Sequence, residues 1–121
     1  MSMNVEIKKQ WVAALESGDY GQCRGHLHSG SSYCCLGVLT ELYIQAHPEG
    51  RGWQPSSSKS SVFSFGSSDD RLTSLLPEVV QEWAGLKSDS PEVGGSLLID
   101  MNDTEALRFK DIAIAIKESD L

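Results

Sequence analysis

The stretch that decides how this chain folds is Tyr20-Gly-Gln-Cys-Arg-Gly-His-Leu-His-Ser-Gly-Ser-Ser-Tyr-Cys-Cys-Leu-Gly-Val-Leu39. It contains one arginine, two histidines and three cysteines but no carboxylate, whereas the whole chain carries a net charge of -7. Its first part is rich in glycine and serine, and its end is apolar. This order predicts a small hairpin that leads into a buried helix, with a local excess of positive charge suited to an anionic ligand.

The apolar end of this stretch predicts the central helix of the fold. The helix starts near Cys34–Leu36 and runs to Ala46, because Pro48 forces an end near His47. Its apolar face is formed by Cys35, Leu39, Leu42 and Ala46.

Three further helices are predicted from apolar residues at helical spacing. The first runs from about Val5 to Glu16, between a capping Asn4 and a terminating Gly18. The second is short, with Pro77 at its first position and Gly85 at its end. The third runs from about Thr104 to Glu118, is capped by Asp103 or Thr104, and buries Phe109, Ile112, Ala113 and Ile116.

Short β-prone segments lie between these helices. Arg24–His28 and Ser31–Cys34 flank the turn Ser29-Gly30, and Ser61–Phe65 and Ser96–Met101 also favour strands. Segments 50–61 and 87–96 are rich in serine and glycine and are expected to be flexible loops. The prediction is a helix-dominated α+β domain spanning residues 1–121, with about four helices and a small antiparallel sheet or hairpin.

Composition limits the classes of function. A chain of 121 residues with 40% hydrophobic residues is expected to fold as one domain. It has no apolar run of about 18 residues and no signal-peptide pattern, so we expect a cytoplasmic protein without a membrane contact. A pI near 4.8 argues against general nucleic-acid binding. It leaves open a small anionic ligand in a local basic pocket, or docking on a basic protein.

The hairpin is the first candidate site. If Arg24–His28 is a strand, alternation places Arg24, His26 and His28 on one face, near the start of the central helix. With Gln22, these side chains could form a rim that binds phosphate or carboxylate groups. The alternative is a solvated hairpin face without a ligand.

The three cysteines are expected to be core residues. Cys23, Cys34 and Cys35 lack the paired spacing of a structural zinc site, and no motif of a cysteine hydrolase surrounds them. Free cysteine is among the most buried residue types. We therefore predict no metal, no cofactor and no catalytic residue.

Two further groups could contact a ligand. Asn102 and Asp103 are ordinary helix-capping residues, but only one of them is needed for a cap, so the other could read a base edge or ribose hydroxyls. Trp53, Phe63 and Phe65 lie in or beside the serine-rich segments, where their rings could stack on a planar ligand or close over the core.

Several motifs carry a resemblance to a family of small phage and prophage proteins. The first part of the pattern is Trp11-Val-Ala-Ala-Leu15, Ser17-Gly18, Tyr20, Gln22, Arg24-Gly25 and Leu27, followed by Tyr33-Cys-Cys-Leu-Gly-Val-Leu39. The later part is Leu76-Pro77, Trp83-Ala-Gly-Leu86, Asn102-Asp103, Phe109 and Ile112-Ala113. The chain departs from the pattern at Cys23 and at the pair His26 and His28.

The resemblance implies a host-takeover or anti-defence role in an infected bacterium. One class of such proteins binds a nucleotide-derived immune signal, of the cyclic nucleotide or ADP-ribose type, without cleaving it. In that hypothesis the protein is a dimer in which Arg24 holds phosphates, Trp53 or a phenylalanine stacks on the base, and Asn102 and Asp103 read the ribose or base. The alternatives are an enzyme that degrades the signal and an inhibitor that docks on a host defence protein.

Overall fold

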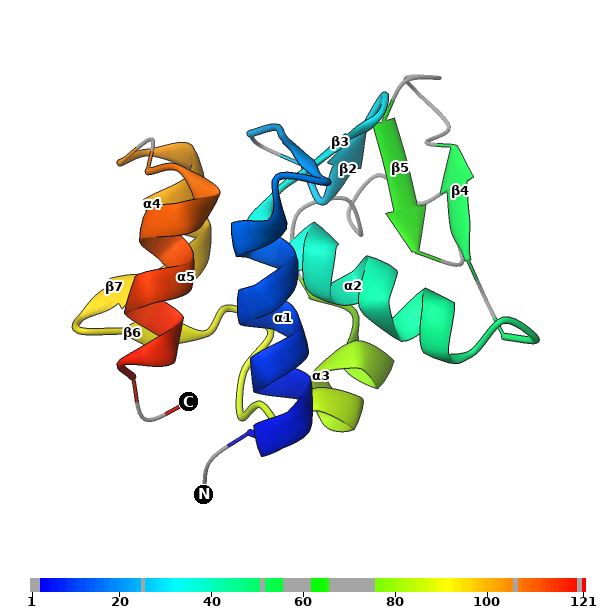
Figure 1. Cartoon of the computed structure of the whole chain (residues 1–121). Coiled ribbons are helices and arrows are strands. Elements are labelled where there is room, and N and C mark those ends of the chain that lie inside the picture. The colour runs from blue at the N-terminus through cyan, green and yellow to red at the C-terminus, as the bar shows by residue number, and fades with distance from the viewer. Residues whose placement is uncertain are drawn as a thin grey trace.

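The apolar run after the hairpin forms the helix α2 (Cys35–Ala46), at the centre of the fold (Figure 1). The computed structural model describes residues 3–24, 26–50, 52–55, 62–65, 76–105, 107–119 and 121. Residues 35–40 of α2 are all buried, and helices α1, α3 and α4 and strand β3 pack against this helix. The prediction of a central helix is confirmed, although Ala46 is exposed and Leu42 is only half-buried.

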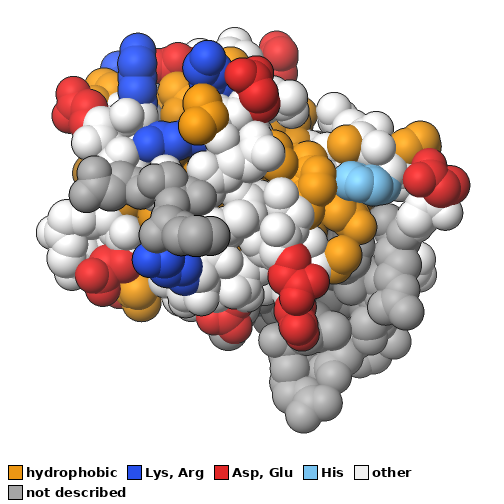
Figure 2. All heavy atoms as spheres, turned by 90° about the horizontal axis from the view of Figure 1, so that it is seen from below, with side chains coloured by type: hydrophobic (Ala, Val, Ile, Leu, Met, Phe, Trp, Pro, Cys, Tyr) orange, Lys and Arg blue, Asp and Glu red, His pale blue; other side chains and the backbone are white. Residues whose placement is uncertain are grey.

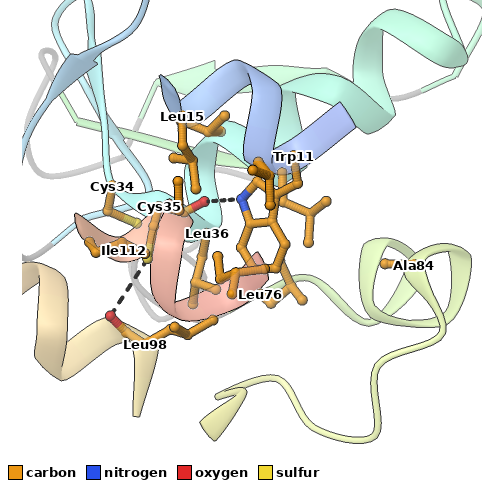
Figure 3. Packing of buried hydrophobic residues seen from close by; sticks show 14 of the residues in the cluster. Trp11, Leu15, Cys34, Cys35, Leu36, Leu76, Ala84, Leu98 and Ile112 are labelled. Carbon is orange, nitrogen blue, oxygen red and sulfur yellow. Dashed lines mark hydrogen bonds between the residues drawn. The ribbon is translucent and has the colours of Figure 1, made fainter. Parts of the chain in front are cut away.

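Helix α1 (Val5–Ser17) matches its prediction at both ends. The side chain of Asn4 accepts hydrogen bonds from the backbone N–H groups of Glu6 and Ile7 at 2.9 and 3.1 Å. Gly18 ends the helix at a φ of 79°, a conformation that favours glycine. The buried Trp11 donates from Nε1 to the carbonyl oxygen of Cys35 at 2.9 Å, which joins α1 to α2 (Figure 3).

The predicted strand Ser96–Met101 is wrong after its second residue. Strand β7 (Ser96–Leu97) pairs with β6 (Glu92–Val93), and helix α4 (Leu98–Asp103) follows at once. The buried side chains of Leu98, Met101 and Asn102 have the three- and four-residue spacing of a helix. The segment 87–96, predicted as a loop, therefore contains most of a hairpin.

The helix predicted over Thr104–Glu118 begins later, as α5 (Phe109–Lys117). Asp103 and Thr104 do not cap it, because α4 includes Asp103 and ends at Thr104, whose N–H donates to the carbonyl of Asp100 at 2.8 Å. Arg108 occupies the N-cap position of α5 instead. The predicted core face is confirmed, since Phe109, Ile112, Ala113 and Ile116 are all buried. The short helix α3 (Glu78–Ala84) ends at Gly85, as predicted, but it begins one residue later than predicted, because Pro77 is its N-cap and not its first helical residue.

A five-stranded sheet covers the other side of α2 (Figure 1). Its order is β1-β3-β2-β5-β4, where β1 and β3 are parallel and the other neighbours are antiparallel. The strands are β1 (Gly21–Gln22), β2 (His28–Ser29), β3 (Ser32–Tyr33), β4 (Trp53–Pro55) and β5 (Val62–Phe65). The domain is α+β and helix-dominated, as predicted, with five helices in its described part.

The sheet corrects two predictions. The segment Arg24–His28 is a strand only at His28, and the turn that follows consists of Gly30 and Ser31, with Gly30 at a φ of 58°. Strand β4 lies inside the segment 50–61, which was predicted as a flexible loop. The other residues of that segment include 51 and 56–61, which lie outside the described residues.

A close backbone contact fixes the hairpin on α2. The carbonyl oxygen of Leu27 accepts a hydrogen bond from the N–H of Cys34 at 3.1 Å. A Cβ atom on Gly37 would collide with the same oxygen, so only glycine fits at this turn of α2. None of the helices in the described residues has the length and apolar character that crossing a bilayer requires.

Candidate ligand-binding site on the five-stranded sheet

Four aromatic side chains gather on one face of the sheet, and we call them the aromatic cluster: His28, Tyr33, Trp53 and Phe63. The imidazole of His28 stacks on Tyr33 with ring centres 4.2 Å apart and on Phe63 with centres 4.5 Å apart. The ring of Trp53 lies 4.9 Å from His28. His28 is directly opposite Tyr33 in β3 and Phe63 in β5, and residues in such cross-strand pairs project on the same face. The strand register therefore assembles the cluster.

The middle ring of the cluster is held by a hydrogen bond to the backbone. His28 is only 8% exposed, and its Nδ1 lies 2.8 Å from the carbonyl oxygen of Ser32. A carbonyl oxygen can only accept, so Nδ1 carries the hydrogen, and Nε2 is the acceptor in the neutral ring. The other three rings are half-buried, so they retain exposed surface that a planar ligand could cover.

A carboxylate from α2 borders the cluster on the β4 side. Glu41 accepts a hydrogen bond from Nε1 of Trp53 at 2.9 Å and another from the amide of Gln45 at 2.8 Å. The amide of Gln45 also lies 3.5 Å from the hydroxyl of Tyr20, whose ring meets Tyr33 edge-to-face with centres 5.5 Å apart. Partial burial, followed by the charge of Glu41 and then by Tyr20, raises the pKa of Tyr33. The phenol therefore stays a hydrogen-bond donor at neutral pH.

The connection between β1 and β2 carries cationic and unpaired polar groups. Arg24 is exposed and makes no ion pair with a carboxylate of the described residues. Two positions later, Nδ1 of His26 is buried without a hydrogen-bond partner. The thiol of Cys23 donates to the carbonyl oxygen of His26 at 3.4 Å. The β1–β2 connection therefore carries an exposed guanidinium and, two positions later, an unpartnered ring nitrogen, and both are groups that can bind an anionic oxygen.

Asn102 joins three distant parts of the chain. It is fully buried, and its Oδ1 accepts from the amide of Gln22 at 2.9 Å and from the backbone N–H of Cys35 at 3.3 Å. Its Nδ2 donates to the carbonyl of Cys23 at 2.8 Å and to the carboxylate of Asp103 at 2.7 Å. All four hydrogen-bonding positions of this amide are therefore used inside the protein.

The three thiols are held in their neutral form. Burial raises the pKa of Cys34 to about 12, and burial is also the main cause that raises the pKa of Cys35 and of Cys23. Cys34 is the N-cap of α2 and accepts from the N–H of Gly37 at 3.4 Å, while Cys35 donates to the carbonyl of Leu98 at 3.6 Å (Figure 3). A thiol nucleophile needs a lowered pKa, so none of the three thiols is activated. The prediction of core cysteines is confirmed for Cys34 and Cys35, whereas Cys23 is only half-buried and lies outside the core.

The model of the family described as "Domain of unknown function (DUF8296)" matches residues 3–120. The chain belongs to this family. No curated protein and no solved structure matches the DUF8296 protein.

The eight site residues predicted from the DUF8296 sequence fall into separate groups. His28 and Trp53 meet in the aromatic cluster, and Phe65 is opposite Trp53 in the β4–β5 pairing, although its side chain lies outside the described residues. Gln22, Asn102 and Asp103 are linked to one another by hydrogen bonds. Arg24 and His26 lie in the β1–β2 connection.

Two of these findings change the predicted roles. Arg24, His26 and His28 do not share a strand face, because the strand begins only at His28 and the three side chains are exposed, half-buried and buried in that order. The amides of Gln22 and Asn102 are occupied by internal hydrogen bonds, Gln22 also donating to the carbonyl of Leu107 at 2.7 Å. In this structure they brace the site instead of facing a ligand. Within the described residues, no three His, Cys, Asp or Glu side chains converge as a metal ion would require.

Sequence reasoning missed the residues of the DUF8296 protein that surround Trp53. The predicted site did not include Glu41, Gln45, Tyr20 or Tyr33. The spacing of Glu41 and Gln45 is a sequence signal, since residues four apart on a helix share a face. Nothing local in the sequence showed that β4 would bring Trp53 against that face.

Proposed function

We propose that this DUF8296 protein binds a nucleotide-derived immune signal of the cyclic nucleotide or ADP-ribose type and sequesters it without cleaving it. The observation that carries the proposal is the aromatic cluster together with the β1–β2 connection, where Arg24 has no carboxylate partner in the described structure and Nδ1 of His26 is unpaired. Stacking rings suit a base, and a free guanidinium suits phosphate.

The positions of the charged side chains indicate how such a ligand would be oriented on the sheet. Glu41 is on the β4 side of the cluster, where it would repel phosphate but could accept from a base amino group. Arg24 and His26 are on the side where β1 connects to β2. Strands β2 and β4 are separated by β5, so they are about 10 Å apart, which is comparable to the span from a base to its phosphate.

Two observations favour binding over cleavage. The thiols have raised pKa values, with Cys34 at about 12, so none is activated as a nucleophile. The ring of His28 is held between Tyr33 and Phe63 and bonded to Ser32, which restrains it from moving as a proton carrier. The resemblance to small phage proteins supports an anti-defence role in the cytoplasm of an infected bacterium. A dimeric state stays a prediction.

The test is incubation of the protein with a panel of cyclic mononucleotides, cyclic dinucleotides and ADP-ribose derivatives. The free pool is analysed by chromatography before and after the protein is heated. Depletion of one nucleotide followed by its intact recovery is the expected result, and Arg24→Ala should weaken its binding by about tenfold or more. Lys87→Ala, which removes an exposed cation elsewhere, is the matched control.

Two outcomes would overturn the proposal. If no nucleotide of the panel is depleted, the sequestration function is wrong. If the heated sample releases a cleaved product, the protein is an enzyme that degrades the signal. Equal binding by Arg24→Ala and Lys87→Ala would place the ligand away from the β1–β2 connection.

A further inference from the structure

A groove of about 350 Å³ runs along the outer face of α1, away from the aromatic cluster. Six of its lining residues follow one another at intervals that alternate between three residues and one, so they lie on a single face of the helix: Val5, Lys8, Lys9, Val12, Ala13 and Glu16. The stripe spans nearly the whole of α1. Lys117 of the neighbouring α5 forms the other wall.

The groove is locally basic in an acidic protein. Three lysines and one glutamate line it, whereas the chain as a whole carries a net charge of -7. Nζ of Lys8 donates to the carbonyl oxygens of Ser119 and Leu121 at 2.8 and 3.4 Å, which holds this ammonium group beside the end of α5. Figure 2 views the molecule from the end where both chain ends lie, and the Lys and Arg side chains visible there lie in the left half of the view, among Asp and Glu side chains.

The same region carries exposed apolar surface. Val5 is 61% exposed and Ile114 is 49% exposed, and these are the two most exposed large hydrophobic residues in the described structure. Ile114 precedes Lys117 by three residues, so both are on the same face of α5. Apolar residues flanked by lysines, on two adjacent helices, are suited to receive an amphipathic helix.

We propose that this groove is a docking site for an acidic amphipathic helix of a partner protein. Charge complementarity selects the occupant, because carboxylates on the incoming helix would face Lys9 and Lys117, whereas Lys8 is already bonded to Ser119 and Leu121. The exposed ion pair of Lys9 with Glu6, at 3.8 Å, would exchange for a pair with the partner. The stripe from Val5 to Glu16 is about 17 Å long at 1.5 Å per residue, which corresponds to a partner helix of about three turns.

Charge also argues against a second copy of this chain in the groove. In a symmetric dimer formed through this face, the same patch meets itself, so the lysine-lined stripes of the two copies would be brought together. Like charges in contact oppose association. The partner is therefore a different protein with an acidic helix.

The test uses a designed peptide of about four turns, with Leu at the i, i+3, i+4 and i+7 positions and Glu on both flanks. A second peptide has every Glu replaced by Lys. Binding to the isotopically labelled full chain is followed by amide chemical shifts in a titration. The acidic peptide should bind saturably, with shifts confined to α1 and α5, and should weaken as salt is raised. The lysine peptide should not bind.

The variant Lys9→Glu/Lys117→Glu should bind the acidic peptide about tenfold more weakly, whereas Lys87→Glu should bind as the parent does. Circular dichroism checks that each variant is folded. The proposal is overturned by no binding of the acidic peptide, by shifts elsewhere, or by equal binding of both peptides. Two further outcomes, each with the peptide affinity unchanged, would also overturn it. In the first, the double charge reversal abolishes a dimer that sedimentation detects. In the second, it abolishes binding to phosphatidylglycerol vesicles.

Discussion

The side-chain amide of Gln22 donates to Oδ1 of Asn102 at 2.9 Å, across 80 positions of sequence. The same nitrogen donates to the carbonyl oxygen of Leu107 at 2.7 Å. Because Asn102 is fully buried, water cannot replace these contacts. They hold β1 against the segment that joins α4 to α5.

Asn102→Ala should lower the free energy of unfolding by about 3 kcal/mol, since it leaves the amide of Gln22, the N–H of Cys35 and the carbonyl of Cys23 without their partner. Urea denaturation measures the loss. Asp100→Ala, at an exposed position of the same helix, should change it by about 0.5 kcal/mol or less. Equal losses for the two variants would contradict the bracing role of Asn102.

Gly37→Ala should destabilise the protein by about 3 kcal/mol or more, because the new Cβ would collide with the carbonyl oxygen of Leu27. The sign of the change in stability is informative, because alanine inside a helix is normally more stable than glycine by about 1 kcal/mol. Gly52→Ala meets no atom within 4 Å and should be close to neutral. Thermal unfolding of both variants checks this, and a stabilised Gly37→Ala would refute the contact.

Alkaline pH should destabilise the protein through Cys34. Its pKa of about 12 in the folded state lies above its ordinary value of 9.0. Between these values the unfolded chain binds fewer protons than the folded one, so stability falls with rising pH. The contribution is fully present below pH 9 and falls by up to about 1.4 kcal/mol per pH unit above it. Urea denaturation from pH 8 to 10.5 measures the slope.

Cys34→Ser is the matched variant for that slope, because serine can keep the N-cap contact to Gly37 while removing the titrating thiol. The variant should lose less stability than the parent over the same pH range. Parallel curves for the two proteins would mean that Cys34 does not carry the dependence.

Glu41→Gln should lower the pKa of Tyr33 toward its ordinary value, because the charge of Glu41 is one of the groups that raise it. Burial remains, so the pKa should not return fully. Ultraviolet titration of the phenolate, in a Tyr20→Phe/Tyr43→Phe background, follows Tyr33 alone. Glu49→Gln, at an exposed position after α2, is the control. An unchanged pKa of Tyr33 in Glu41→Gln would contradict the placement of Glu41 beside the aromatic cluster.

The parts of the fold that depend on local signals were predictable. Asn4 and Gly18 mark the two ends of α1, because the effect of a capping residue or of a left-handed glycine is confined to the adjacent helical turn. The same reasoning failed at Ser96–Met101, where a short apolar run suits a strand and a helix equally until its partners are known. It also failed at Asp103, which has the chemistry of a cap but lies in the last turn of α4.

The site was predicted less well, because its contacts are between distant segments. The sequence identified His28 and Trp53 as candidates, but not that β5 would stand between their strands and complete the stack with Phe63. The sequence also predicted that Asn102 binds the ligand. Nothing near Asn102 in the sequence shows that Gln22 and Cys35 will use its amide.

The long separations around Asn102 bear on the order of folding. Its bonds to Cys35 and Gln22 close loops of 67 and 80 residues, whereas the bond from Cys34 to Leu27 closes a short one. Closing a long loop costs more entropy, so we expect the hairpin and α2 to associate first and the Asn102 contacts to form after the rate-limiting step. Asn102 would then act as a latch: its loss would speed unfolding and leave the rate of folding nearly unchanged.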